Sequence, residues 1–578
     1  MTNNIEQRDC SGWQQLPSTW SDSLRKILAA RGVKSADDLV YPLADLPKPE
    51  QMLGMDKAVA LLAQALCEDQ RIMIVADFDS DGATSCALAI RSLRAMGAKQ
   101  LDFIVPNRFV HGYGLTPELL DDIPLENQPD LLVTVDNGIA SLAGVDAAHA
   151  RGIKVLITDH HLPGEQLPDA DAIINPNQDG DTFPSKNLAG VGVCFYLLLG
   201  LRQYLRQQHW FEQQQLPPPK MNSFLDLVAL GTVADVVPLD KLNRTLVNIG
   251  LTRIRQGLAC AGINALISIA GKTVANLATT DLSFSVAPRL NAAGRMEDMS
   301  KGIHTLLTDD VNEALSLAQT LDNINQQRRS VEKDMQQQAL AMLQELEFEN
   351  DKKPLGYCLY NADWHQGVIG LLASRIKERQ HRPVIVFAQG SDGEIKGSAR
   401  SITGIHIRDV LALVANQAPE MLNRFGGHAM AAGLTLAQQD LPRFESLFLS
   451  ALQQMVDPSV LEQTLLSDGE LDIKEISLDL AELLPTAAPW GQAFPEPRFH
   501  GQFLVEKIRS VGQQSEHLRL VLRLDDGRSI VAIAFRQQQP DWLHEDGKVI
   551  LRYQLAVNEF RHQRNVQLIV DEVLNVNE

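Results

Sequence analysis

The sequence predicts a multidomain α/β protein that ends in a β-barrel, and three observations support this prediction. The chain has 578 residues, which is too many for one domain at roughly 150 residues per domain. From about residue 51, apolar strand-like runs alternate with helical patterns, as in a doubly wound parallel sheet. After about residue 465, the pattern changes to short alternating strands separated by turns.

Composition narrows the class of protein. The hydrophobic content of 45% supports large cores, and the formal net charge of -20 argues against a surface coated with DNA-binding charge while permitting a local basic channel. No apolar run is long enough to predict a transmembrane helix, and the first residues lack the pattern of a signal peptide. The six cysteines are scattered without a C-x-x-C pair, so we expect reduced thiols in a cytoplasmic protein.

The first α/β domain is expected over residues 51–308, after a lead-in over residues 1–50 with one short helix near Ser23–Arg31. Residues 181–260 are predicted to be largely helical, and the Gln-rich, proline-broken segment Gln207–Pro219 to be an exposed loop. The preceding elements are helix Asp56–Leu66, strand Arg71–Ala76, helix Ala83–Met96, strand Leu101–Val105, strand Leu131–Val135, helix Ala140–Ala150 and strand Lys154–Ile157.

An acidic stretch follows the first buried strand of this domain. Asp77, Asp79 and Asp81 lie between the apolar run Ile72–Ala76 and a helix start. Open α/β sheets place their ligands at the carboxyl ends of strands, and crowded carboxylates repel one another unless a hard cation such as Mg²⁺ or Mn²⁺ binds them. A solvated acidic turn is the simpler alternative. An EF-hand calcium loop is excluded, because its twelfth position is Leu88 rather than Glu.

Three further elements carry metal-type side chains. Asp136 and the run Asp159-His160-His161 each follow an apolar strand, and Asp235 stands alone in an apolar segment. Taken singly, each has a simpler explanation as a turn residue, a helix cap or a surface feature. Strand ends of one parallel sheet converge on the same edge, however, so we expect these residues to form one site.

These four elements, in this order, resemble the motifs of the DHH phosphoesterase superfamily, and within it the bacterial single-strand-specific exonucleases. The resemblance extends over nearly the whole chain after about residue 50. One departure concerns the first motif: many relatives have His two residues before the first Asp, where this chain has Val75. Asp77 is the residue expected to substitute for that imidazole.

The resemblance implies a site with two ions, Mg²⁺ or Mn²⁺, roughly 3.5–4 Å apart. His161 is expected to hydrogen-bond the scissile phosphate or to assist the leaving oxygen, and Asp159 to orient the histidines. Asp136 is expected to bridge the ions. The implied metal ligands are Asp77, Asp79, Asp81, Asp136, His160 and Asp235.

Two loops of the first domain are candidates for substrate binding. Arg108 and Tyr113 belong to a glycine-containing loop, where an Arg suits a phosphate and an aromatic ring suits a base. An ordinary ordered loop is the alternative. By resemblance, Arg108 contacts the terminal phosphate and Tyr113 lies at the DNA entrance. Arg289 and Arg295 are predicted to lie on a turn-rich loop.

A connector helix is expected over residues 309–350, because Asp309–Glu347 is a helical pattern without Pro or Gly. Its polar run Gln326–Arg329 is predicted to be a solvated face.

A smaller α/β domain is expected over residues 351–455, with strands Leu355–Tyr360, Pro383–Ala388 and Glu394–Ser398 and helix Gly367–Arg379. It resembles the DHH-associated domain, whose G-G-H motif, here Gly426-Gly427-His428, faces the metal site across a cleft. Ser398 and Arg400 are expected to hold the 5′-terminal phosphate together with Arg108.

A barrel of the OB type is expected over residues 465–578. Its strands are predicted at Gln502–Ile508, Leu518–Leu524, Ser529–Phe535, Val549–Val557 and Asn565–Val573. Cations and aromatic rings mix on it in a way that suits single-stranded nucleic acid, although a purely structural barrel is possible. These residues are Phe535, Arg536, Tyr553, Phe560, Arg561, His562 and Arg564.

The sequence therefore predicts a metal-dependent exonuclease that degrades single-stranded DNA 5′→3′ to mononucleotides, in DNA repair and recombination. The polarity, the DNA preference and the partners, a single-strand-binding protein and a helicase, come from the resemblance. The chain is expected to be a monomer and to have no membrane partner. A phosphodiesterase for short oligonucleotides or cyclic dinucleotides, and a non-catalytic single-strand-binding scaffold, are the alternatives.

Overall fold

The computed structural model describes residues 4–349, 353–391, 393–422, 424–512, 515–560 and 563–576. Arg561 and His562, two of the residues predicted for the barrel surface, lie outside this range. The chain forms two compact units. The larger unit is Gln7–Ile324 with Ser467–Glu578, and the smaller unit is Met1–Glu6 with Asn325–Leu466.

The larger unit is built on a five-stranded parallel sheet in the order β3-β2-β4-β5-β6. The chain leaves the first strand, β2, in one direction for β3 and crosses back in the other for β4, so the strand order reverses between β2 and β4. Such a switch point is where doubly wound sheets bind ligands. The strands are β2 Ile72–Ala76, β3 Leu101–Ile104, β4 Leu131–Val135, β5 Lys154–Thr158 and β6 Ala172–Ile174.

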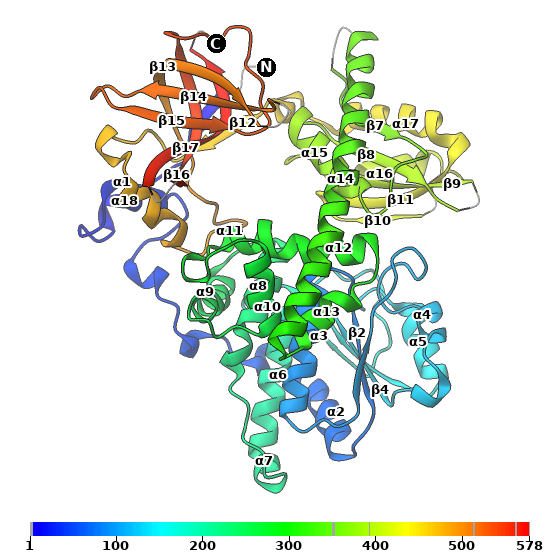
Figure 1. The fold of residues 1–578 in the computed structure, drawn as a ribbon. Helices are drawn as coiled ribbons and strands as arrows, with labels where there is room; N and C mark the ends of the chain where they lie inside the picture. The colour runs from blue at the N-terminus through cyan, green and yellow to red at the C-terminus, as the bar shows by residue number, and fades with distance from the viewer. Residues whose placement is uncertain are drawn as a thin grey trace. The chain divides into compact units, whose positions relative to one another are not determined.

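Helices cover both faces of this sheet, as its buried strands require. Met73 and Val75 of β2 pack with α4 and α5, whereas Ile74 and Ala76 pack with α2, α3 and α6. Figure 1 shows these two layers on either side of β2 and β4. The helices are α1 Asp22–Ala29, α2 Met55–Cys67, α3 Ser80–Ala95, α4 Pro117–Asp121, α5 Leu142–Ala150, α6 Gly190–Gln207, α7 Trp210–Gln213, α8 Leu225–Asp235, α9 Lys241–Arg255, α10 Ala261–Ile269, α11 Thr279–Asp281, α12 Ala287–Met296 and α13 Ser300–Leu307.

Two predicted loops are helical in the structure. The segment Gln207–Pro219 contains α7, whose Trp210 and Phe211 are buried, and the indole of Trp210 donates a hydrogen bond to the Met96 carbonyl at 2.8 Å. The many glutamines around Trp210 and Phe211 predicted an exposed loop, although these two aromatic side chains are buried. The segment around Arg289, predicted to be a turn-rich loop, is helix α12. Pro288 is compatible with this helix because it lies in the first turn, where the backbone N–H that proline lacks has no partner in the helix.

A closed five-stranded barrel, in the order β13-β14-β15-β17-β16, completes the larger unit and confirms the predicted C-terminal fold. The segment that leads into the barrel is joined to the residues after α1 by Arg31 and Asp468, which form an ion pair at 2.7 Å with both side chains 1% exposed. The same segment contacts α9, where Arg244 lies over the Phe494 ring. The strands are β13 Phe499–Val511, β14 His517–Arg523, β15 Ser529–Ala534, β16 Lys548–Phe560 and β17 Gln563–Asn575, and helix α18 is Leu478–Leu483.

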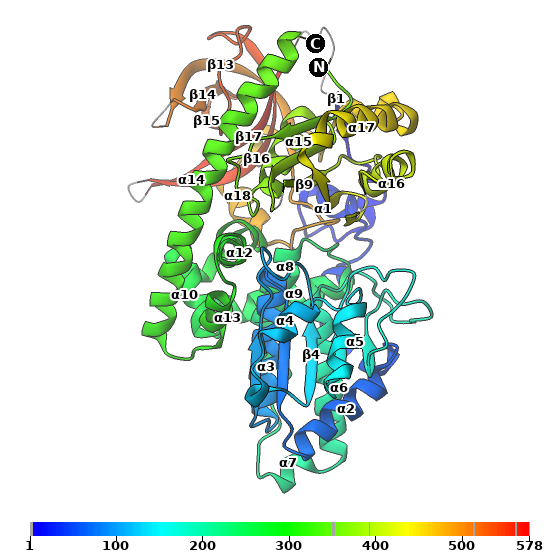
Figure 2. The same ribbon diagram turned by 90° about the vertical axis from the view of Figure 1, so that its right-hand side faces the viewer.

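The predicted connector is confirmed as the long helix α14, Val311–Glu349 (Figure 2). Its second half belongs to the smaller unit, where the buried Glu332 contacts Arg328 at 2.7 Å and Arg375 of α15 at 3.1 Å. The prediction of a solvated face was therefore wrong for Arg328, whose side chain is only 12% exposed.

The smaller unit contains a mixed sheet in the order β10-β11-β9-β8-β7, with helices packed on it. Its elements are β7 Tyr357–Tyr360, α15 Ile369–Gln380, β8 Val384–Gln389, β9 Glu394–Arg400, α16 Ile407–Gln417, β10 Arg424–Gly427, β11 Ala431–Ala437 and α17 Leu441–Met455. A separate two-stranded sheet pairs β1 Asn4–Gln7 with β12 Thr464–Ser467. Among the described helices of the chain, none is both long and apolar enough to cross a membrane.

Candidate active site

The first acidic motif forms the turn from β2 into α3. Asp77 is 4% exposed and Asp81 is 1% exposed. Asp79 is the N-cap of α3, and one of its carboxylate oxygens accepts hydrogen bonds from the backbone N–H groups of Asp81 and Gly82. A Cβ on Gly82 would lie 2.4 Å from the Asp77 carbonyl oxygen, so the turn closes this tightly only with glycine.

Helix α12 holds the same turn from the other side. The Asn291 side-chain oxygen accepts hydrogen bonds from the Ser80 backbone N–H at 2.7 Å and the Ser80 hydroxyl at 2.9 Å. A Cβ on Gly294 would lie 1.8 Å from the Phe78 carbonyl oxygen, so α12 packs directly on the turn. Sequence reasoning missed Asn291, because nothing in the order of residues pairs it with Ser80, 211 positions away.

Asp136 follows β4, on the other side of the switch point. Its φ is 61°, a left-handed conformation that few residues other than glycine adopt, and its side chain is buried. The first turn of α6 lies against it: a Cβ on Gly190 would be 2.5 Å from the Asp136 Cβ. The backbone N–H groups of Gly190 and Val191 donate to the two carboxylate oxygens of Asp81 at 2.6 and 2.9 Å. The positive end of α6 therefore offsets part of the negative charge.

The third motif is ordered by the carboxylate of Asp159. It accepts hydrogen bonds from the Ile139 and His160 backbone N–H groups at 2.9 and 2.7 Å, and it contacts Nδ1 of His161 at 2.7 Å. This arrangement supports the expected orienting role of Asp159.

Two asparagines that the sequence reasoning missed fix the backbone of the histidines. Asn175 donates to the His161 carbonyl at 2.8 Å, and Asn177 donates to the His160 carbonyl at 2.5 Å. Both asparagines follow β6, so even the last strand of the sheet contributes to the same edge.

The six predicted metal ligands converge on one place in the larger unit. Nε2 of His160 lies 3.2 Å from Oδ1 of Asp136 and 3.5 Å from Oδ2 of Asp235, which ends α8. Three groups have ligand atoms within 4.8 Å of one another, and Asp136 and His160 each belong to two of them. The groups are Asp136, His160 and His161; Asp81, His160 and Asp235; and Asp77, Asp79 and Asp136.

The electrostatics of this cluster fit a cation. Burial raises the pKa of Asp77 and Asp136 well above the usual range, and the neighbouring carboxylates Asp79 and Asp81 respectively raise it further. Among the described residues, Oδ1 of Asp77, Oδ1 of Asp136 and Nε2 of His160 are buried and make no hydrogen bond; the last two atoms lie 3.2 Å apart, but not in hydrogen-bonding geometry. Buried acceptors of this kind are costly unless a ligand meets them, and oxygen with imidazole is the donor set that Mg²⁺ or Mn²⁺ would accept.

The two histidines have opposite charge preferences. Burial lowers the pKa of His160, which favours the neutral imidazole that binds metals. Burial opposes protonation of His161 too, but its hydrogen bond to Asp159 prevails and raises the pKa of His161 to about 9. In the metal-free protein His161 is therefore protonated at neutral pH, and its imidazolium can donate a hydrogen bond to an anion.

The loop between β3 and α4 brings Arg108 and Tyr113 to the cluster. The Arg108 guanidinium lies over the Phe78 ring, 4.1 Å from its centroid. The Tyr113 hydroxyl donates to the Asp136 carbonyl at 3.1 Å, and its ring lies edge-on to His161 with the centroids 5.8 Å apart. Tyr113 remains 46% exposed, so it forms part of the rim.

Arg289, a predicted substrate-binding residue, is paired with a protein carboxylate. Its guanidinium forms an ion pair with Asp322 of α14 at 2.8 Å, and both side chains are mostly buried. It therefore fastens α12 to the first half of α14. Arg295 lies on the last turn of α12, with a half-buried side chain.

The predicted residues of the smaller unit gather around β9. Arg400 donates to the Ser398 hydroxyl at 3.1 Å, and a Cβ on Gly370, in the first turn of α15, would lie 2.9 Å from an Arg400 nitrogen. Within the described ranges no carboxylate lies within ion-pair distance of Arg400, and burial lowers the pKa of its guanidinium.

The G-G-H motif forms a strand and turn rather than a helix cap. Gly426 and Gly427 belong to β10, which pairs with β11, and the His428 backbone N–H donates to the Ala431 carbonyl at 2.8 Å. A Cβ on Gly427 would lie 2.4 Å from that carbonyl oxygen, so this turn requires glycine.

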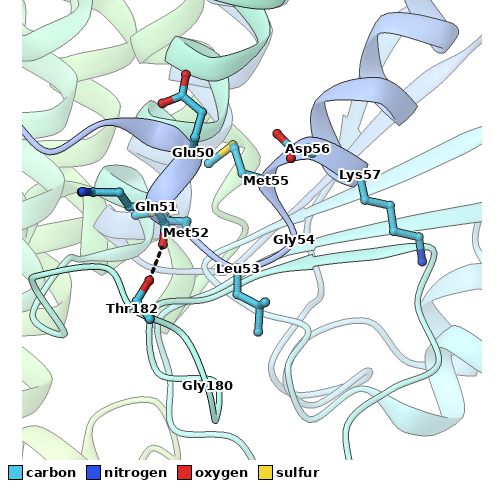
Figure 3. Close-up of a pocket in the computed structure, with 10 residues that line it drawn as sticks. All are labelled: Glu50, Gln51, Met52, Leu53, Gly54, Met55, Asp56, Lys57, Gly180 and Thr182. Atoms are coloured by element: carbon cyan, nitrogen blue, oxygen red, sulfur yellow. Dashed lines mark hydrogen bonds between the residues drawn. The ribbon is translucent and has the colours of Figure 1, made fainter.

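A separate open pocket of about 370 Å³ lies at the start of α2 (Figure 3). It is lined by the segment Glu50–Lys57 and by Gly180 and Thr182, whose hydroxyl donates to the Gln51 carbonyl at 3.4 Å. None of the predicted site residues lines it.

Comparison with known families assigns the three parts of the chain. Residues 71–232 match the DHH family, N-terminal domain; residues 353–454 match the DHHA1 domain; and residues 467–572 match the RecJ OB domain. Together with the fold and the acidic cluster, these matches define a DHH phosphoesterase.

Similarity to full-length proteins identifies the family within the DHH phosphoesterases. The chain is 47% identical over 572 residues to the single-stranded-DNA-specific exonuclease RecJ of Salmonella typhimurium, and the match covers 98% of each chain. It is 34% identical over 496 residues to RecJ of Thermus thermophilus, which covers 85% of this chain and 67% of that protein. The chain therefore belongs to the RecJ family.

Solved structures agree with this assignment. The crystal structure of RecJ in complex with Mn²⁺ from Thermus thermophilus matches with a TM-score of 0.78 and 30% identity, covering 99% of this chain and 79% of that one. The corresponding complex with Mg²⁺ matches with a TM-score of 0.74 and 28% identity, over 99% and 78% of the two chains.

Proposed function

We propose that this protein is a metal-dependent exonuclease that degrades single-stranded DNA in the 5′→3′ direction to mononucleotides. The observation that carries the proposal is the convergence of buried, unpartnered carboxylate and imidazole atoms at the switch point of the sheet. Membership of the RecJ family adds the substrate class, since its relatives are named for single-stranded DNA.

The cluster suggests how two ions would be held. Asp136 has a ligand atom within 4.8 Å of Asp77 and Asp79 and another contact at 3.2 Å to Nε2 of His160, so it would contribute to both sites. Asp81, His160 and Asp235 would complete one site, and Asp77 and Asp79 the other. Bound there, two divalent ions would supply a deprotonated water near neutral pH and positive charge beside the phosphate oxygens.

The protein's own groups would orient the phosphate and handle a proton. His161, held by Asp159 and protonated at neutral pH, would donate a hydrogen bond to the scissile phosphate or a proton to the leaving oxygen. The Arg108 guanidinium, stacked on Phe78, would contribute positive charge near the same turn. Tyr113 on the rim would restrict entry to a single strand.

Recognition of the strand end is assigned to the smaller unit. Arg400 is a half-buried residue whose guanidinium has no carboxylate within ion-pair distance in the part of the chain that the structure describes, and Ser398 adds a hydroxyl beside it. A doubly charged terminal phosphate would meet both through charge-assisted hydrogen bonds. The backbone of Gly426 and Gly427, with His428, would approach the strand without obstruction by side chains.

The surroundings of the reaction follow from the family and the composition. We propose roles in DNA repair and recombination, beside a single-strand-binding protein and a helicase. The six cysteines are free in the structure, which supports a cytoplasmic location. We propose that the chain acts as a monomer.

A phosphodiesterase for short oligonucleotides is the main rival, since it would need only the metal cluster. The test is digestion of a 60-nucleotide single strand with Mn²⁺, carrying a label at either the 5′ or the 3′ end. We expect a 5′ label to be released first, as a mononucleotide, with no release in EDTA or from blunt duplex. Cleavage confined to oligonucleotides shorter than about ten residues would favour the rival.

A further inference from the structure

A π-helix, Leu282–Val286, lies beside the candidate metal centre and continues directly into α12. Its Ser283 hydroxyl contacts the Val233 carbonyl at 3.5 Å, two residues before the predicted ligand Asp235. A single turn of π-helix is rare and frequently marks a functional site, because it inserts a residue into an otherwise regular helix.

The other end of this segment is also tied to the cluster. Asn291 of α12 accepts two hydrogen bonds from Ser80, the residue next to the predicted ligand Asp79. The segment from 283 to 291 is therefore hydrogen-bonded at both ends to elements that carry predicted ligands.

What the π-helix presents is the ring of Phe284. Leu282 and Val286 are fully buried, whereas Phe284 is 79% exposed, more than any other aromatic side chain among the described residues. Because residues four apart share one face of a helix and the residue between them points away, the two aliphatic anchors hold the phenyl ring outward.

A second exposed apolar side chain lies at the same end of α8. Val236 directly follows Asp235, is 60% exposed and has a φ of 64°. A β-branched residue in the left-handed region is a backbone outlier, and such strain gathers at functional sites. Val236 and Phe284 are thus two exposed apolar side chains on elements that meet where Ser283 contacts Val233, two residues before Asp235.

We propose that Phe284 is a stacking platform for one nucleobase of the single strand whose phosphate lies over the metal cluster. This inference rests on the proposed nuclease function. Every base has a flat face that stacks on an aromatic ring, so such a platform grips a strand without reading its sequence. A subsite of this kind would fix how far the strand advances after each cleavage.

The size of the feature favours a base over a protein partner. A stable protein interface buries about 800 Å² on each side, whereas one aromatic side chain offers about 150–250 Å². A single phenyl ring matches the area of a single base.

The experiment pairs variants of Phe284 with strands that lack one base. A set of 5′-phosphorylated single strands is made with one abasic position each, moved stepwise from the 5′ end, and kcat/KM is measured with Mn²⁺. For the wild-type protein we expect one position at which loss of the base lowers kcat/KM about five- to a hundred-fold. Phe284→Ala should lower kcat/KM on the intact strand by a similar factor, mainly through KM, and should abolish the effect of that abasic position.

Controls separate this subsite from the overall function. Phe284→Trp should retain the sensitivity, and Leu125→Ala, which removes a side chain that is 82% exposed, should change neither value. The melting temperature should stay the same, because the ring packs on little. The proposal is overturned if Phe284→Ala keeps the wild-type abasic profile, or if no position is sensitive in the wild type. Failure of the wild type to degrade single strands at all would instead contradict the proposed function.

Discussion

The candidate sites in the two units carry charge of opposite sign. In the larger unit, Oδ1 of Asp77 and Oδ1 of Asp136 are buried without a hydrogen bond from any described group, although Nε2 of His160 lies 3.2 Å from Asp136 Oδ1. In the smaller unit, Arg400 holds a guanidinium that no described carboxylate neutralises. Crowded buried carboxylates are costly unless a cation meets them, and we propose that the half-buried Arg400 receives a phosphate.

The two sites differ in how firmly the fold holds them. Asp136 is fixed by a left-handed backbone and by the first turn of α6, and the Asp77–Gly82 turn is fixed by α12. Arg400 is a long side chain held by the Ser398 hydroxyl and its neighbour's carbonyl. The proposed metal ligands are therefore preorganised by the backbone, whereas Arg400, the group proposed to meet the strand end, is a more adjustable side chain.

The largest effect is expected from Asp136→Asn. Asparagine tolerates the left-handed backbone, so the variant removes charge without adding strain. Loss of a bridging ligand should lower kcat at least about 1,000-fold, about 4 kcal/mol. Asp146→Asn, an exposed carboxylate on α5, is the control and should keep full activity. Retention of more than about a tenth of the wild-type rate, a loss below about 1.4 kcal/mol, would exclude Asp136 as a shared ligand.

The same variant should stabilise the protein when metal is absent. Burial raises the pKa of Asp136 above its unfolded value of about 3.9, so ionisation at neutral pH destabilises the metal-free fold, and increasingly so as pH rises from about 4 to the folded-state pKa. Asp136→Asn removes this cost. We expect a higher melting temperature in EDTA at pH 7, with a smaller difference at pH 4. A lower melting temperature in EDTA would show that the carboxylate is already compensated by protein groups.

The next largest effect is expected from Arg400, the positively charged residue of the smaller unit. Arg400→Ala should reduce the preference for 5′-phosphorylated over 5′-hydroxyl strands by about ten- to a hundred-fold, since hydrogen bonds between charged groups contribute about 1.5–3 kcal/mol. Affinity for Mn²⁺ should stay the same. Arg408→Ala, an exposed arginine of α16, is the matched control. Competition between the two kinds of strand measures the preference, and an unchanged ratio would place the phosphate site elsewhere.

A smaller effect tests whether α12 preorganises the metal turn. Asn291→Ala removes the acceptor for both Ser80 hydrogen bonds, and supporting contacts of this kind typically contribute ten- to a hundred-fold in metal affinity. Asn291→Asp keeps an acceptor oxygen and should recover most of the loss. Calorimetric titration of Mn²⁺ gives the affinity. Equal affinity in Asn291→Ala and the wild type would show that the turn holds itself.

The smallest effect is expected on the barrel. Phe535, 52% exposed, belongs to the predicted DNA-binding surface, and Phe535→Ala should weaken binding of long strands a few-fold without changing turnover at saturation. A point variant is preferable to truncation near residue 460, because truncation would remove Asp468 and leave Arg31 buried without its partner. If Phe535→Ala and the wild type give identical binding curves at several salt concentrations, the barrel surface does not bind the strand through this ring.

Sequence patterns predicted the sheet, the connector helix and the barrel because each depends on local periodicity. They also placed the six carboxylate and imidazole residues at strand ends, where topology brings them together. Sequence patterns could not predict the residues that hold the site and the connector in place. Asn291 and Ser80 are 211 residues apart in the sequence, and nothing local distinguishes the buried Arg328 from an exposed charge on a helix. The left-handed φ of Asp136 is likewise imposed by packing against α6 rather than by its neighbours in sequence.

The most direct test of the central claim is a calorimetric titration of Mn²⁺ into the metal-free protein at pH 7.5, for the wild type and for Asp136→Asn. The claim is that buried, unpartnered atoms of the larger unit form a two-cation site. We expect two ions per wild-type chain, and loss of both, or at least a hundred-fold weaker binding of both, in Asp136→Asn, because that carboxylate belongs to two ligand groups. Two ions bound equally well by both proteins would contradict the account.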